Sequence, residues 1–282
     1  MIWPRWLAFS SPVMNDRPIQ ELQPLMSAQV RFAVSTPSLF LRSLLFSLGM
    51  ITSLTLIAPL IVVGFFLPFV RRYQLSQMWA GFNIWWLRVT CGITYQVTGA
   101  EHIPNRPVIV MAKHQSTWET LFFNWYLPPM AWVVKRELLW VPLFGWALAL
   151  LRPIAINRKL GSAAVKQVIR QGMAHLRRGQ WVLIFPEGTR TAPGVRKRYG
   201  LGGAVLATHS GFPVLPIAHN AGEFWSRRGF FKRPGTVHVV FGPLLESAGR
   251  SPQALNQQVE DWIESNMAAI SAVPITSVVT DK

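Results

Sequence analysis

Acidic residues and cysteine are scarce in this chain of 282 residues. It carries 12 Asp and Glu against 28 Lys and Arg, which gives a formal net charge of +16, and it has one cysteine, Cys91. A single cysteine excludes an intramolecular disulfide and a cysteine-rich zinc site, and its apolar surroundings favour a buried packing role. The six histidines form no H-x-x-x-H or H-E-x-x-H pattern, so we expect no metal site.

Charged residues of either sign are also few, at 14% of the chain, whereas half of the residues are hydrophobic. A nucleic-acid-binding protein with so basic a balance is normally rich in charge, so we expect no nucleic-acid partner. Thirteen Trp and seventeen Phe are typical instead of a protein at a lipid interface, where aromatic rings anchor and basic side chains meet anionic headgroups. We therefore expect a protein that binds anionic membrane lipid.

One long stretch without a charged residue lies in the first quarter of the chain. It runs from Ser43 to Val70, between Arg42 and the arginine pair at 71–72. At about 1.5 Å per residue, a helix of this length exceeds the roughly 30 Å hydrocarbon core of a bilayer. Glycines and prolines inside the stretch leave a kinked spanning helix and a re-entrant hairpin as alternatives. A buried core helix of a soluble protein is a third.

The patterns along the chain divide it into four regions. Residues 1–40 contain several prolines and no sustained periodicity, which indicates an irregular tail. Residues 41–96 are predicted to form hydrophobic membrane-anchoring helices, the second of them rich in aromatic residues and suited to the interface. Residues 97–250 alternate strands and helices, and residues 251–282 form a C-terminal helix followed by a frayed tail. The alternation predicts an α/β fold with a mixed central sheet and flanking helices.

A polar block follows a short apolar run that we interpret as a buried strand. The run is VIVMA at 108–112, and the block is KHQSTWE at 113–119. The block therefore lies at the carboxyl end of a strand, where open α/β sheets bind ligands. His114 and Glu119 are five positions apart, so the carboxylate can turn back to the imidazole if a helix begins after Ser116. An imidazole held by a carboxylate at one nitrogen offers the other as a proton acceptor, although an ordinary cap or surface pair also has this spacing.

A second polar block, FPEGTR at 185–190, follows the apolar run WVLI at 181–184. Gly188 allows a close approach of the backbone to a ligand. The carboxylate of Glu187 can accept a hydrogen bond from a substrate hydroxyl, and Arg190 offers a planar fork suited to phosphate. The block is therefore a candidate binding site for a phosphorylated substrate.

Four blocks in this order resemble the motifs of the glycerophospholipid acyltransferases, namely residues 113–119, 154–158, 185–190 and 212–217. The likeness extends from about residue 99 to 242, is closest to the bacterial 1-acylglycerol-3-phosphate (lysophosphatidate) acyltransferases, and is most specific in the third block. It implies two paired N-terminal membrane-associated helices ahead of a catalytic domain. It also implies transfer of a fatty acyl group from coenzyme A or an acyl-carrier protein to the sn-2 hydroxyl of lysophosphatidate, with no cofactor.

The resemblance also implies roles for individual residues. His114 is the expected general base and Glu119 the carboxylate that orients it. The expected substrate-binding residues are Arg158, Glu187, Gly188, Thr189 and Arg190. Among these, the two arginines would hold the phosphate and Glu187 would position the glycerol. The first block of the family usually ends in Asp, and Glu119 is one methylene longer, so the backbone must rebuild its geometry towards His114.

Three other functions stay open on the sequence. They are an acyltransferase for another lysolipid acceptor, an acyl thioesterase that gives the acyl group to water, and a basic membrane-binding protein without catalysis. No acyl-enzyme intermediate is expected, since no G-x-S-x-G motif occurs. The resemblance implies the bacterial inner (cytoplasmic) membrane. Because arginines flank residues 43–70 on both sides, the positive-inside rule gives only a weak preference for a catalytic domain in the cytoplasm.

Overall fold

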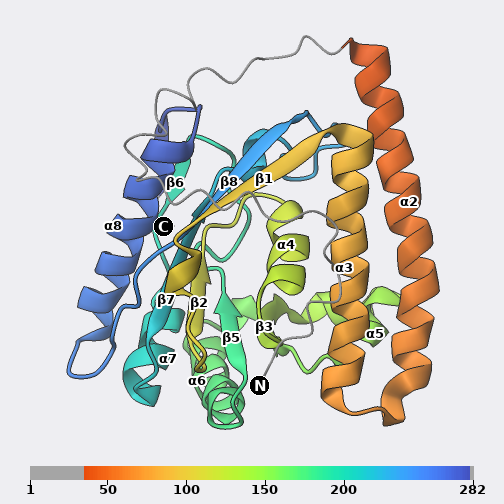
Figure 1. The fold of residues 1–282 in the computed structure, drawn as a ribbon. Helices are drawn as coiled ribbons and strands as arrows, with labels where there is room; N and C mark the ends of the chain where they lie inside the picture. Colours follow the sequence, from red (N-terminus) through yellow and green to blue (C-terminus); the bar gives the residue numbers. More distant parts are fainter. Residues whose placement is uncertain (1–34, 280–282) are drawn as a thin grey trace.

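A mixed sheet with helices on both faces forms the centre of the molecule (Figure 1). The computed structural model describes residues 35–279, and within them seven strands pair in the order β1-β8-β7-β2-β5-β3-β4. Their bounds are β1 Ile93–Thr98, β2 Ile109–Ala112, β3 Met130–Lys135, β4 Ile154–Ile156, β5 Trp181–Ile184, β7 Val214–His219 and β8 Gly235–Phe241. Strands β7 and β8 are antiparallel and the other neighbours are parallel. The predicted mixed α/β fold is confirmed.

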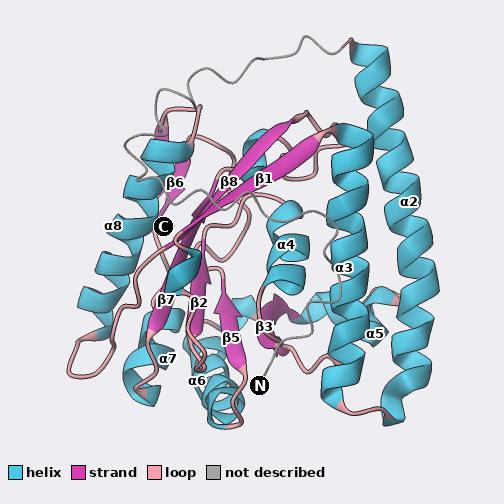
Figure 2. Cartoon of the chain, in the orientation of Figure 1, coloured by secondary structure: helices cyan, strands magenta, loops and turns pink. Residues whose placement is uncertain are grey.

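The helices form two layers and a hairpin (Figure 2). Their bounds are α2 Thr36–Val63, α3 Phe69–Cys91, α4 Trp118–Tyr126, α5 Phe144–Leu150, α6 Ser162–Arg177, α7 Gly202–Ser210 and α8 Pro252–Ile270. Short 3₁₀ turns are η1 Gly64–Phe66, η2 Ala100–His102, η3 Arg136–Trp140, η4 Arg158–Leu160 and η5 Ala221–Glu223. One hydrophobic cluster joins α3 and α4 to the sheet, and a second joins α6, α7 and α8 to its other face.

Strand β2 shows why its sequence is continuously apolar. Val110 and Ala112 enter the cluster on the α4 side, whereas Ile109 and Met111 enter the cluster on the α6 side. Side chains of a strand alternate between the two faces of a sheet, so a strand covered on both faces needs apolar residues at every position. This burial fixes β2 in the centre of the sheet. It thereby fixes the position of the strand's carboxyl end, which His114 follows.

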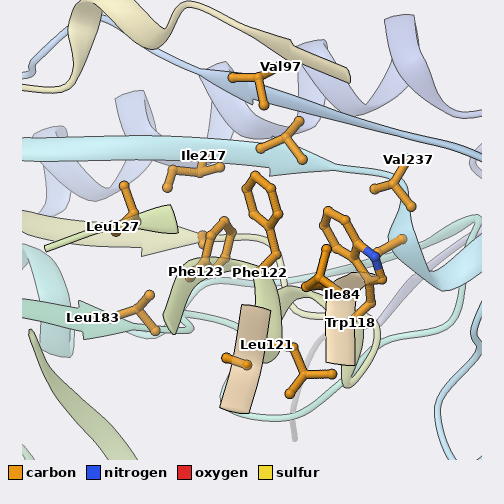
Figure 3. Packing of buried hydrophobic residues seen from close by; sticks show 14 of the residues in the cluster. Ile84, Val97, Trp118, Leu121, Phe122, Phe123, Leu127, Leu183, Ile217 and Val237 are labelled. Carbon is orange, nitrogen blue, oxygen red and sulfur yellow. The ribbon is translucent and has the colours of Figure 1, made fainter. Parts of the chain in front are cut away.

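Helix α4 is anchored by large rings on its sheet side. Trp118, Phe122 and Phe123 are buried and pack beneath Ile217 and other strand residues (Figure 3). The rings of Trp118 and Phe122 are stacked with centroids 4.7 Å apart. Full burial of one such side chain contributes about 1.5–3 kcal/mol. The anchored first turn of α4 is the turn that carries Glu119.

Helices α2 and α3 form an antiparallel hairpin that lies against the α4 side of the domain (Figure 1). The indole nitrogens of Trp79 and Trp86 bond to Ser53 Oγ at 3.1 Å and to the Leu45 carbonyl at 3.3 Å, which sets the register of the two helices. Helix α2 begins at Thr36, inside the region expected to be irregular, and continues through Pro59 before the chain reverses at η1. The apolar stretch is thus one continuous helix over most of its length, and the chain reverses only near its end.

The outer face of the hairpin is apolar. Of the described helices, the segment Thr36–Phe66 alone is long and apolar enough to cross a membrane, and 17% of its most apolar window is buried. Exposed apolar side chains cover both helices: Phe40, Leu41, Leu45, Leu48, Ile51, Leu56, Leu60, Val63, Phe65, Phe66, Val70, Met78, Phe82, Trp85 and Val89. These features support membrane association.

Two short elements differ from the sequence-based expectation. Strand β1 follows α3 after one residue and pairs with β8, in a region where we expected helices and then a turn. Residues Ser277–Val279 form strand β9, which pairs with β6 at Val195–Lys197, so part of the expected frayed tail is paired. The rest of the predicted N-terminal tail, residues 1–34, lies outside the described residues, as do residues 280–282.

Candidate active site

His114 and Glu119 form a buried pair at the junction of β2 and α4. His114 Nδ1 lies 2.9 Å from Glu119 Oε1, and the two side chains are 13% and 0% exposed. The same carboxylate accepts the backbone amides of Gln115 at 2.9 Å and Ser116 at 2.7 Å. It therefore also stabilises the amino end of α4, where partial positive charge gathers. The longer Glu side chain reaches the imidazole by folding back onto the first turn of its own helix.

The electrostatics of this pair favour a charged carboxylate and a neutral imidazole. Burial by itself raises the pKa of Glu119, but nearby His219, the His114 hydrogen bond and the Ser116 amide outweigh it, so the pKa is lowered. Burial lowers the pKa of His114 below its ordinary 6.5, against the opposing effect of Glu119. The imidazole is thus neutral at pH 7. With its Nδ1 proton donated to Glu119, it presents Nε2 as the proton acceptor.

The ring plane of His114 is fixed by an aromatic neighbour. Phe185 stacks on the imidazole with ring centroids 3.8 Å apart and an interplanar angle of 11°. Phe185 opens the FPEGTR block, so the two sequence blocks meet through their rings as well as their polar groups. Sequence analysis did not assign this role to Phe185, although its place at the end of an apolar strand was a usable signal.

Arg158, from residues 154–158, and Arg190, from residues 185–190, converge on His114. The charges of both arginines lower the pKa of His114, Arg190 more than Arg158, so both guanidinium groups lie within electrostatic reach of the imidazole. The Nε atom of Arg190 is buried and has no hydrogen-bond partner among the residues that the structure describes. A buried N–H without a partner costs roughly 1–3 kcal/mol, which a bound anion would recover.

Gly188 and Thr189 form the turn between Glu187 and Arg190. Gly188 has φ +70° and donates its amide to the Phe185 carbonyl at 3.0 Å, and both residues are half-buried. The left-handed conformation suits glycine because other residues are strained there. This turn brings Arg190 back towards His114.

Glu187 is a predicted substrate-binding residue whose side chain is buried in this structure. Its side chain is 0% exposed and lies 3.3 Å from Lys113 Nζ. It accepts the backbone amide of His114 at 3.1 Å and the hydroxyl of Thr191. Burial raises its pKa to about 7, although Lys113 opposes this. The carboxylate is thus enclosed behind residues 113–119 and holds the His114 backbone in place, whereas its contact with the glycerol of a substrate stays a prediction.

A second buried histidine supports the same loop. His219, at the end of β7, places Nε2 2.8 Å from the carbonyl oxygen of Lys113 and is fully buried. Its position follows the fourth sequence block, whose last strand lies beside β2. In residues 35–279 no group of three or more His, Cys, Asp or Glu side chains is arranged to hold a metal ion.

Comparisons with known proteins agree with this geometry. A family model described as acyltransferase matches residues 94–220. The chain is 51% identical over 211 residues to a 1-acyl-sn-glycerol-3-phosphate acyltransferase of Pseudomonas aeruginosa, with 73% of this chain and 82% of the relative covered. It is 32% identical over 165 residues to a 1-acyl-sn-glycerol-3-phosphate acyltransferase alpha of Mus musculus, with 57% and 58% covered.

A solved structure shows the same fold. The crystal structure of the 1-acyl-sn-glycerophosphate acyltransferase PlsC from Thermotoga maritima superposes with a TM-score of 0.69 at 22% sequence identity. The match covers 82% of this chain and 95% of that one. The Pseudomonas relative and the family model establish that the chain belongs to the acyltransferase family.

Proposed function

We propose that this enzyme transfers a fatty acyl group from an acyl thioester to the sn-2 hydroxyl of 1-acylglycerol-3-phosphate, which gives phosphatidate. The observation that carries the proposal is a neutral, carboxylate-held His114 under the charges of two arginines. The printed names of the relatives, which are 1-acyl-sn-glycerol-3-phosphate acyltransferases, support the choice of acceptor.

The chemistry needs a base but no covalent enzyme intermediate. His114 Nε2 takes the proton of the acceptor hydroxyl while the oxygen attacks the thioester carbonyl. Glu119 holds Nδ1–H and stabilises the imidazolium that forms. When the carbon–sulfur bond breaks, the imidazolium returns its proton to the departing thiolate, so the histidine ends the cycle neutral.

The acceptor phosphate is the proposed partner of the two arginines. A phosphate oxygen at Arg190 would bond the Nε–H that lacks a partner within residues 35–279. Charge-assisted bonds from a guanidinium fork also fix the orientation of a phosphate. Arg158 would add a second positive charge from the end of the edge strand β4. The arginines would therefore set the distance between the phosphate and the hydroxyl that faces His114.

The acceptor is a lipid located in a bilayer, and the apolar hairpin would bring the enzyme into contact with that bilayer. We place the enzyme at the inner membrane with its catalytic domain in the cytoplasm, where anionic headgroups would meet the basic surface. The exposed apolar faces of α2 and α3 and the net charge of +16 support this placement, because both favour contact with an anionic membrane surface.

The deciding experiment is an acyl-transfer assay on the membrane fraction. Acyl-coenzyme A and acyl-carrier protein serve as donors, and lysophosphatidate, uncharged lysolipids and water compete as acceptors. We expect lysophosphatidate to be preferred, and His114→Ala to lose about a thousandfold in kcat, within the range for loss of a general base. Release of free fatty acid without acceptor dependence would show a thioesterase. Equal use of lysolipids without phosphate would remove the role proposed for Arg190.

The pH dependence of the assay tests the protonation state of the base. Because burial lowers the pKa of His114 below 6.5, the imidazole is active above that pH and loses activity as it takes up a proton below it. We expect kcat to fall on the acid side. A maximum of activity below pH 5 would contradict a neutral histidine as the base.

A further inference from the structure

A buried charge cluster links the catalytic loop to the C-terminal helix. Lys113 Nζ lies 2.8 Å from Glu264 Oε1 of α8 and 3.3 Å from Glu187 Oε1. Tyr199 donates its hydroxyl to the same Glu264 oxygen at 2.8 Å. Lys113, Glu187 and Glu264 are 2%, 2% and 5% exposed. Three residues far apart in the chain thus share one solvent-excluded ion cluster.

The cluster acts on the peptide that carries the catalytic base. Glu187 accepts the amide of His114 at 3.1 Å, and the amide of Thr191 donates to the His114 carbonyl at 2.8 Å. Thr191 also donates its hydroxyl to Glu187. The backbone amide and the carbonyl of His114 are therefore held by Glu187 and Thr191, and Glu187 is the ionisable one of these two partners.

Lys113 is directed at α8 by its backbone. Its amide donates to the Ile217 carbonyl at 3.0 Å, and its own carbonyl faces His219 Nε2 at 2.8 Å. With the main chain fixed to β7, the side chain crosses to the face of the sheet that α8 covers, where Glu264 and Tyr199 receive it. A shift of α8 would therefore move the ammonium group and with it the partner of Glu187.

Such a cluster is poorly explained by stability alone. Removing charges from water is costly, and apolar replacements for a buried ion pair are often neutral or stabilising. Here one ammonium group lies between two carboxylates, so the cluster has an excess negative charge whenever both carboxylates are ionised. What the arrangement does provide is a fixed position for Glu187 behind His114.

We propose that Lys113 and Glu264 are positioning residues of the active site, and that through them helix α8 holds Glu187 against the backbone of His114. The proposal rests on the function proposed above, with His114 as the base. It adds to the catalytic machinery a lysine that does not face the substrate and a glutamate from outside the four sequence blocks.

The charge state of Glu187 gives this proposal a specific signature. Glu187 faces Lys113 from the end of β2, Glu264 from α8, Tyr199 from the segment before α7, and Thr191 from its own loop. Its pKa is raised to about 7 mainly by burial, is lowered by Lys113 and is raised by Glu264. Tyr199 stays protonated, because burial and the two carboxylates raise its pKa well above the usual range. Glu187 thus titrates near neutral pH.

The test compares Lys113→Met and Glu264→Gln in the full-length enzyme by following kcat against pH. Lys113→Met removes the cation that lowers the pKa of Glu187. Two groups then limit kcat on the acid side, His114 below pH 6.5 and Glu187 near pH 7, and the inflection near pH 7 belongs to Glu187. In Lys113→Met this inflection should move to higher pH, and kcat at pH 7 should fall about tenfold or more, which is the size expected for a misplaced catalytic group. Glu264→Gln removes a carboxylate that raises this pKa, so its inflection should move to lower pH, with a lower plateau. KM for either substrate should stay within about twofold.

Asp261→Asn is the matched control, because Asp261 lies on the same helix but its side chain is 60% exposed. It should leave both kcat and the inflection unchanged, and thermal unfolding in detergent should show that all variants are folded. Inflections that stay at the wild-type pH in both test variants would overturn the proposal. So would an equal loss of kcat at every pH. If His114→Ala retains transfer activity, the proposed role of His114 as the base fails instead, which separates the two results.

Discussion

At the scale of single residues, neighbours hold the His114 imidazole, the base of the proposed mechanism, from three sides. Glu119 holds Nδ1, Phe185 covers one ring face, and Glu187 fixes the backbone amide. The remaining ring nitrogen, Nε2, is the one available to a substrate hydroxyl. A small displacement of any neighbour would therefore change the angle at which the base meets its proton, and effects on kcat are expected before effects on binding.

Arg190→Lys separates the guanidinium fork from its charge. Lysine keeps the positive charge but loses the planar set of N–H groups, including the buried Nε that has no partner within the described residues. We expect KM for lysophosphatidate to rise about tenfold to a hundredfold, equivalent to one charge-assisted hydrogen bond of roughly 1.5–3 kcal/mol. KM for the acyl donor should change little. An unchanged KM for lysophosphatidate would show that the phosphate binds elsewhere.

Sequence reasoning at this scale predicted the contact between His114 and Glu119 better than their surroundings. His114 and Glu119 were predictable because both lie in one short block with a spacing that a helix start can close. The direction of Glu187 was not, since a carboxylate in a turn can face the ligand or the interior, and only Lys113 and Thr191 decide between them. Glu264 lies 145 residues beyond Glu119, in helix α8. The sequence of α8 shows only the pattern of an amphipathic helix that packs on a core, so nothing in it indicates a contact with Lys113.

At the scale of elements, strongly apolar or strongly periodic segments were predictable and short polar ones were not. Strands β2 and β5 are continuously apolar because both faces are covered. Strand β1 is an edge strand in which residues 94–96 are half-buried. Its sequence, ITYQVT, alternates weakly and follows a long helix with one intervening glycine, so the pairing with β8 provides what the local pattern lacks.

The packing of the hairpin depends on a glycine contact between its helices. A methyl group added at Gly49 would overlap the indole ring of Trp86, which is bonded to the Leu45 carbonyl. Gly49→Ala should therefore destabilise the protein by about 1–3 kcal/mol, the usual cost of overpacking, despite the better helix propensity of alanine. Thermal unfolding in detergent measures the change.

Gly64→Ala is the matched comparison, since it adds the same methyl group to the same apolar segment. Gly64 has φ −76°, and an added methyl would meet the end of the flexible Leu67 side chain at 3.0 Å. This variant should unfold within about 0.5 kcal/mol of wild type, as expected for a substitution that can be absorbed. Equal destabilisation by both variants would show that the Trp86 contact is not what limits the packing.

At the scale of the whole molecule, the hairpin and the catalytic domain share one long contact. Buried residues of α3 extend from Arg72 to Cys91, and α2 packs along α3. If α2 crossed a bilayer, the polar domain beside the hairpin would have to enter the hydrocarbon core, where unsatisfied polar groups are very costly. We therefore propose that the hairpin lies in one face of the membrane with its exposed apolar side towards lipid.

Two valines with nearly equal exposure test this orientation. Val63 at the end of α2 is 68% exposed and Val278 in β9 is 64% exposed, but only Val63 belongs to the apolar face of the hairpin. A charge at Val63 would have to enter lipid, and loss of one buried apolar side chain alone removes about 1.5–3 kcal/mol, so Val63→Asp should weaken binding to anionic vesicles at least tenfold. Val278→Asp, the control, should bind like wild type. Equal weakening by both variants in a flotation assay would mean that net charge, and not the hairpin face, brings the enzyme to its lipid substrate.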